Sequence, residues 1–180
     1  MTVSVRSITL MAIFIALNMI LSRICSVHIP FEGVESIRIG FGTLPLVLSG
    51  ILLGARLGFL AGLIGDVLGF ILAPSGIFLP TFTIAAGLHG LLTGLIAGSG
   101  KIKECSRWRM YLAIAVSQIL VAIILVPCLL QWHFGIPFWV TLPARLITQG
   151  ILIPIYCMLI YAIVDRVKFC YREQSVGSSQ

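Results

Sequence analysis

Three arginines in this chain occupy positions where a membrane protein rarely keeps a charge. Arg23, Arg38 and Arg145 fall at or just inside one side of a six-helix arrangement, and the nine other basic residues fall on the opposite side. Basic residues gather on the cytoplasmic side of membrane proteins, so we expect these three to face outward. An ionisable group kept near hydrocarbon is costly and marks a functional position. The three guanidinium groups therefore predict capture of an anionic solute.

An acid, an imidazole and a guanidinium are expected at one depth. Asp66, His89 and Arg145 each lie seven or eight residues from the expected outer end of a different helix. At a rise of about 1.5 Å per residue, each lies about 10 to 12 Å below the outer face. The sequence thus predicts a pocket that opens outward and is lined by all three side chains. A structural Asp66–Arg145 ion pair is an alternative that does not exclude ligand contact.

Two further arginines and two aromatic residues complete the predicted binding site. Arg23 and Arg38 flank the first outer segment, and a guanidinium binds carboxylates with two parallel hydrogen bonds. Snorkelling to lipid headgroups and, for Arg38, an ion pair with a nearby glutamate are the alternatives. Phe41 and Phe82 are expected near the outer face, where rings can sandwich a flat heterocycle. Aromatic residues are also common at membrane interfaces without any ligand.

The composition places nearly the whole chain in a bilayer. The 180 residues are 59% hydrophobic and 10% charged, with a mean hydropathy of +1.11. Soluble domains carry about 25% charged residues. The net charge of +6 follows from basic cytoplasmic loops and requires no nucleic-acid partner. Five cysteines are present without metal-ligand spacing, so they predict no metal site.

The apolar segments predict an all-α, polytopic membrane protein with six transmembrane helices. Each segment approaches the length of about 20 apolar residues that spans a membrane. We expect a single domain over 1–180 with a frayed tail at 168–180, and a loop over 28–38 that caps the pocket. Six spans place both termini in the cytoplasm of a multi-pass plasma-membrane protein. The predicted helices cover 7–27, 41–53, 57–73, 81–98, 108–130 and 138–167.

Motifs for catalysis are missing from the sequence. It contains no H-E-x-x-H, no G-x-S-x-G and no Walker A loop, so we expect neither an enzyme nor a bound cofactor. An intramembrane enzyme built on His89 and Asp66 would need a further nucleophile or metal ligand at their depth. Ala12 and Ala16 form a small-residue stripe on the first helix. Such a stripe packs closely against another helix, either within this chain or in a partner.

Several motifs, taken together, resemble the substrate-binding S components of energy-coupling-factor (ECF) vitamin transporters, most closely the folate-specific type. The likeness runs from the first predicted helix to the sixth. It is carried by LMAIFIAL at 10–17, IRIGFGTLP at 37–45, GLIGDVLG at 62–69, FLPTFTI at 78–84 and FWVTLPARLI at 138–147.

This resemblance implies a binding protein that does not transport alone. Its expected partners are a transmembrane T subunit, which would pack on Ala12 and Ala16, and two cytoplasmic ATPases that bind ATP. The family's mechanism is a toppling of the S component in the bilayer. Folate would contact the arginines through its carboxylate tail and Asp66 through its aminopyrimidine edge. The seven expected substrate contacts are Arg23, Arg38, Phe41, Asp66, Phe82, His89 and Arg145.

One segment departs from the folate-type pattern. Relatives of that type tend to carry Asn-Thr with Trp late in the fifth helix, where this chain has Val126-Pro127-Cys128-Leu129. We expect Pro127 to kink the helix. The loss of polar groups there leaves the substrate open, so an S component for another small molecule, such as a queuosine precursor or pantothenate, is an alternative. A structural membrane subunit without a ligand is a separate alternative.

Overall fold

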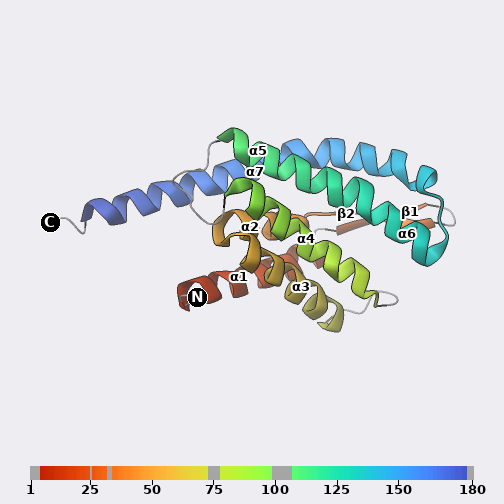
Figure 1. Ribbon diagram of the computed structural model, residues 1–180, viewed down its shortest axis with the longest axis horizontal. Coiled ribbons are helices and arrows are strands. Elements are labelled where there is room, and N and C mark those ends of the chain that lie inside the picture. The colour runs from red at the N-terminus through yellow and green to blue at the C-terminus, as the bar shows by residue number, and fades with distance from the viewer. Residues whose placement is uncertain (1–4, 25, 32–33, 73–77, 99–106, 178–180) are drawn as a thin grey trace.

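The protein is a bundle of helices with one β-hairpin (Figure 1). The computed structural model describes residues 5–24, 26–31, 34–72, 78–98 and 107–177. α5, the π-helical η2 and α6 follow one another without a break and form one long helix. The elements are α1 Val5–Ile24, β1 Ser26–Phe31, β2 Val34–Gly40, α2 Thr43–Leu53, α3 Ala55–Leu72, α4 Pro80–Ala97, α5 Arg107–Ser117, η2 Gln118–Leu125, α6 Val126–Phe134 and α7 Phe138–Gly177.

Four of the described helical segments are long and apolar enough to cross a membrane. They are Ala55–Leu72, Pro80–Ala97, Trp108–Phe134 and Phe138–Asp165. Shorter apolar stretches, Ser7–Ser22 and Thr43–Leu53, lie in α1 and α2. The predicted six-helix membrane fold is therefore confirmed. Helix boundaries agree within a few residues except at the end of α7, which is helical as far as Gly177, whereas the sequence suggests an end at 167.

The segment predicted as a loop over 28–38 is instead an antiparallel hairpin. β1 and β2 pair with Val27 opposite Ile39 and His28 opposite Arg38. The prediction was wrong because Pro30, Gly33 and the two acids of this stretch also suit a loop. A single polar residue separates Val27 from Ile29 and Ile37 from Ile39, and such alternation is typical of strands. The hairpin lies at the end of the bundle opposite the start of α1 and the end of α7 (Figure 1), and β2 packs against α7.

Helices α2, α3 and α4 are in backbone contact through glycines. A Cβ atom added to Gly58 of α3 would lie 2.7 Å from the Cα of Gly50 in α2 and 2.8 Å from the carbonyl oxygen of Gly90 in α4. A Cβ atom on Gly62 would lie 2.6 Å from the Cα of Gly87. Small residues at these positions let the three helices approach more closely than side chains would permit. This seam makes α2, α3 and α4 one tightly packed unit.

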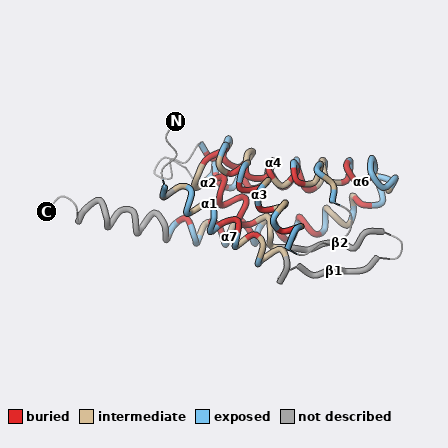
Figure 2. Tube along the Cα trace, turned by 90° about the horizontal axis from the view of Figure 1, so that it is seen from below, coloured by how far each residue is buried: buried red, intermediate tan, exposed pale blue. Residues whose placement is uncertain are grey.

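Two hydrophobic clusters fill the bundle at different depths. The larger cluster includes Phe14 of α1, Leu48 of α2, Ile114 of α5 and Leu152 and Tyr156 of α7. A smaller cluster combines residues nearer the hairpin end of the molecule: Phe82, Ala85, Leu88 and Leu92 of α4 with Val121, Leu125 and Leu129. The buried segments run through the middle of the bundle (Figure 2).

The long fifth helix changes its winding in the middle. From Gln118 to Leu125 it is a π-helix, and the Val126 N–H bonds to the Val121 carbonyl, five residues back. Pro127 follows at once, in the first turn of α6. Proline has no N–H and its ring clashes with the carbonyl four residues before it. A wide turn accommodates both effects, so the expected kink takes the form of a π-helical insertion.

Candidate binding site

Asp66 is held by a hydroxyl from the neighbouring helix. The Thr83 Oγ1 donates a hydrogen bond of 2.7 Å to Asp66 Oδ2. Asp66 is half-buried on α3 and Thr83 is buried on α4. One carboxylate oxygen is therefore engaged in joining α3 to α4. The pairing also fixes the relative depth of the two helices at this point.

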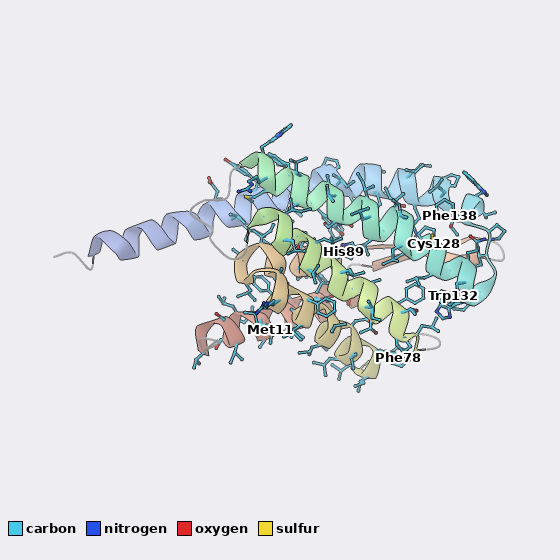
Figure 3. The ribbon with its side chains drawn as sticks, in the orientation of Figure 1. Met11, Phe78, His89, Cys128, Trp132 and Phe138 are labelled. Atoms are coloured by element: carbon cyan, nitrogen blue, oxygen red, sulfur yellow. The ribbon has the colours of Figure 1, made fainter. Side chains whose placement is uncertain are left out.

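His89 lies deeper than the sequence suggests. It is on α4, six residues beyond Thr83, which corresponds to about 9 Å along the helix axis. Because Asp66 pairs with Thr83, the acid and the imidazole are not at one level, contrary to the expectation from counting residues. His89 is only 4% exposed. Its Nδ1 atom is buried and has no hydrogen-bond partner among the described residues. Figure 3 shows His89 in the middle of the bundle.

Arg145 belongs to the inward stripe of α7. It is half-buried, and Thr141 and Gln149, four residues before and after it, are both buried. Residues four apart share one face of a helix, so Arg145 occupies the side of α7 that faces the bundle. Further along the same stripe, Leu152 and Tyr156 enter the larger hydrophobic cluster. Arg145 is therefore nearer the start of α7 than the part of the stripe that enters the larger cluster.

Two glutamines that the sequence analysis did not single out are buried in the same region. Gln118, the first residue of η2, is 0% exposed, and Gln149 of α7 is 7% exposed. The Nε2 and Oε1 atoms of Gln118 and the Oε1 atom of Gln149 have no hydrogen-bond partner in the described part of the chain. A buried polar group without a partner costs about 1 to 3 kcal/mol. Their one sequence signal is a polar amide inside an apolar span.

His89, Gln118 and Gln149 are buried polar side chains on three neighbouring elements, and we call them the polar layer. On α4, His89 lies between Leu88 and Leu92 of the smaller cluster. On the fifth helix, Gln118 lies between Ile114 of the larger cluster and Val121 of the smaller one. Gln149 lies three residues before Leu152 of the larger cluster. Because η2 packs against both α4 and α7, Gln118 lies on the element between the other two.

The remaining predicted contacts lie at different depths, and Phe41 packs with the larger, deeper cluster and not near the outer face as expected. Phe41 packs edge-on against Tyr156, with ring centroids 6.1 Å apart. The Thr43 hydroxyl donates a hydrogen bond of 2.8 Å to the Tyr156 oxygen, which ties the start of α2 to α7. Phe82 packs with the smaller hydrophobic cluster. Arg23 is in the last turn of α1 and Arg38 in β2; their side chains lie outside the described part of the structure.

The alanine stripe of α1 faces away from the bundle. Ala12 and Ala16 are both exposed, whereas Phe14, Ile15 and Asn18 are buried. The amide of Asn18 lies between Gly42 and Gly65: Cβ atoms added there would lie 3.3 Å from its Oδ1 and 2.9 Å from its Nδ2. The inner face of α1 is therefore occupied by α2 and α3, and its small-residue face is open. Internal packing does not use the stripe.

Metal-binding residues do not cluster in the described part of the chain. No group of three His, Cys, Asp or Glu side chains is arranged to hold a metal ion there. Cys128 and Cys157 are free thiols. The polar groups that the described residues do bring together suit hydrogen bonding to an organic solute.

Comparisons with known proteins agree on one family. The model of the family described as ECF-type riboflavin transporter, S component, matches residues 2–167. The folate transporter FolT of Clostridium novyi (strain NT) is 32% identical over 161 residues, covering 88% of this chain and 89% of that protein.

Solved structures agree as well. A crystal structure of FolT bound with folic acid is similar with a TM-score of 0.76 and 27% identity, covering 91% of this chain and 97% of that one. The S component for biotin from an ECF-type transporter, at 18% identity and 91% coverage of both chains, has the same fold with a TM-score of 0.70. The region matched by the family model, residues 2–167, includes every membrane span predicted from the sequence. The chain belongs to the S components of ECF-type transporters and is the substrate-binding subunit of such a transporter, a multi-pass membrane protein and not an enzyme.

Proposed function

We propose that this S component binds folate at the outer face of the membrane. The observation that carries the proposal is Arg145, a half-buried guanidinium on the bundle side of α7, in a chain 32% identical to a folate transporter. Folate has a flat pterin ring and a tail with two carboxylates. A guanidinium binds a carboxylate through two parallel hydrogen bonds. Arg145 holds the tail, together with Arg38 and Arg23 from the segments at the same end.

The transport step needs partners that this chain does not contain. We infer that a T subunit packs on the exposed alanine stripe of α1 and that two cytoplasmic ATPases supply the energy. Both ends of the chain lie in the cytoplasm, which puts the basic loops inside and the hairpin outside. The S component reorients in the bilayer and delivers folate to the cytoplasmic side. Exposure of Ala12 and Ala16 supports this arrangement.

Riboflavin is the second candidate, because the matching family model carries its name. Its ring is flat like a pterin, but it has no carboxylate for Arg145 to bind. The two candidates therefore differ in their dependence on the guanidinium. The altered end of the fifth helix, around Pro127, lies next to the smaller hydrophobic cluster. In this proposal its effect on binding does not distinguish the pterin ring of folate from the ring of riboflavin.

Isothermal titration calorimetry of the purified protein tests the proposal. Folate and 5-formyltetrahydrofolate should bind, and riboflavin, thiamine, pantothenate and a queuosine precursor should not. Arg145→Ala should weaken folate binding roughly 10- to 100-fold, the loss of one hydrogen-bonded charge pair. Arg56→Ala, at an exposed position on α3, is the matched control and should bind like the wild type. Unchanged folate affinity in both Arg145→Ala and Arg38→Ala would exclude the arginine clamp, and binding of riboflavin alone would exclude folate.

A further inference from the structure

The polar layer of His89, Gln118 and Gln149 has a hydrogen-bonding capacity that the described chain does not use. Four of its buried atoms have no partner among the described residues: His89 Nδ1, Gln118 Nε2, Gln118 Oε1 and Gln149 Oε1. Leucine or methionine would fill the same volumes without this cost. We propose that this layer binds the hydrogen-bonding edge of the pterin ring and that Gln118 determines specificity for the pterin. This inference rests on the proposed function.

The unpaired atoms match the chemistry of a heterocycle and not that of a carboxylate. Each glutamine amide presents a donor and an acceptor, and an imidazole nitrogen serves as either. A carboxylate only accepts hydrogen bonds, so it would leave both glutamine carbonyls unpaired. The pterin edge carries an amino group, a ring N–H and a carbonyl side by side. Such an edge satisfies donors and acceptors together, and it requires no fixed charge from the protein.

The order of groups along α7 gives the ligand a direction. Gln149 lies four residues beyond Arg145, about 6 Å further from the hairpin end of the bundle. The neutral layer is therefore deep and the guanidinium lies nearer the outer end. The ring enters first and the carboxylate tail remains near Arg145. The role that the sequence suggests for Asp66, contact with the aminopyrimidine edge, passes in this proposal to Gln118, since Thr83 engages one Asp66 oxygen about 9 Å nearer the outer end.

The π-helix positions Gln118 for this role. Gln118 is the first residue of η2, where the winding changes and the helix reaches both α4 and α7. π-helical insertions occur mostly as short segments and frequently at functional sites. The layer is closed in the structure, because Gln118 is not exposed at all. The ring therefore reaches it as the surrounding side chains move apart, and the hydrogen bonds gained on binding offset that movement.

A binding role and a purely structural role of Gln118 predict opposite effects of Gln118→Leu. For a binding residue, leucine removes an unpaired polar group, so the Tm of the ligand-free protein should stay equal or rise. The Kd for folate should at the same time increase roughly 10- to 100-fold. Binding of p-aminobenzoylglutamate, the part of folate that lacks the pterin ring, should be unchanged. Gln131→Leu, the same substitution at an exposed position of α6, should alter none of these values.

Two measurements distinguish a binding role of Gln118 from a structural one. They are titration calorimetry with folate and with p-aminobenzoylglutamate, and thermal unfolding of each ligand-free variant. Folate bound equally by wild type and Gln118→Leu would overturn the inference and leave the proposed function standing. Absence of folate binding by the wild type would instead overturn the proposed function. A lowered Tm with equal losses for folate and its tail would identify a structural residue. Gln149→Leu repeats the test if Gln118→Leu does not fold, with the same expected signs.

Discussion

A single hydrogen bond joins the acid of the candidate site to the helix packed against it. The Thr83 hydroxyl contacts the Asp66 carboxylate at 2.7 Å, close to the glycine seam between α3 and α4. A hydrogen bond to a charged group in low dielectric is about twice as strong as one between neutral groups. This bond therefore fixes the carboxylate and the register of the two helices together.

Thr83→Val should lower stability by about 1.5 to 3 kcal/mol, since the half-buried carboxylate loses its hydrogen-bond donor while the side-chain volume is kept. Chemical unfolding in detergent, monitored by circular dichroism, measures the change. Thr9→Val on the exposed face of α1 makes the same chemical substitution and should change stability by less than about 0.5 kcal/mol. Equal effects of the two substitutions would show that the Thr83–Asp66 bond contributes nothing.

At the residue scale, the charged residues of the candidate site could be recognised from the sequence. Arg145, Asp66 and His89 stand out in apolar spans because each is costly there, and the structure places all three on the bundle side of their helices or within it. Their relative depth did not follow from counting, because the pairing of Asp66 with Thr83 depends on how α3 and α4 slide along their glycines. Gln118 and Gln149 were missed, since a neutral amide carries no charge and does not affect the topology of the membrane spans.

At the element scale, the close packing of α2, α3 and α4 depends on glycines at the positions where their backbones touch. Gly58 touches the backbones of both α2 and α4, so its position has no room for even a methyl group. Gly69, on the same helix, has nothing within 4 Å of an added Cβ atom. A substitution at Gly58 therefore measures the effect of helix packing, and the same substitution at Gly69 measures the intrinsic helix preference of the new residue.

Gly58→Ala should destabilise the protein by about 1 to 3 kcal/mol, because the methyl group forces two helix backbones apart. Gly69→Ala should instead be neutral or stabilise it by up to about 1 kcal/mol, the ordinary gain of alanine over glycine in a helix. Thermal unfolding of the two variants in one detergent gives both values. A Gly58→Ala protein as stable as Gly69→Ala would mean that the seam is looser than the structure indicates.

The helices themselves were predictable, and two departures from regular helix were not. Apolar length alone identified each span within a few residues. The hairpin over 26–40 was hidden by its charges, Pro30 and Gly33, which also suit a loop. The π-helix at Gln118–Leu125 was hidden because an apolar stretch has the same composition whether it winds as an α- or a π-helix. Pro127 signals a disturbance, but the backbone decides whether it becomes a kink or a wide turn.

At the scale of the whole molecule, α1 has two faces with different surroundings. Its inner face holds Phe14, Ile15 and Asn18 in the bundle, and its outer face presents Ala12 and Ala16. Close approach of a partner helix requires such small residues. In the proposed arrangement, ligand binding and partner binding use different surfaces, and they should respond separately to mutation.

Ala12→Leu and Ala16→Leu should together abolish folate uptake by cells that contain the energising subunits, while the purified variant binds folate like the wild type. The added side chains keep a partner helix at a distance without touching the bundle. Uptake of labelled folate and co-purification with the T subunit are the measurements. Ala162→Leu, on an exposed face of α7, is the control and should transport normally. Normal uptake by the double variant would place the docking surface elsewhere.

The length of α7 has a mechanical consequence. Its apolar span ends at Asp165, but the helix runs on to Gly177, so about 18 Å of helix extends past the bundle (Figure 1). In the proposed reorientation this extension moves together with the bundle. Neighbouring subunits must therefore leave room for it along the path of that movement.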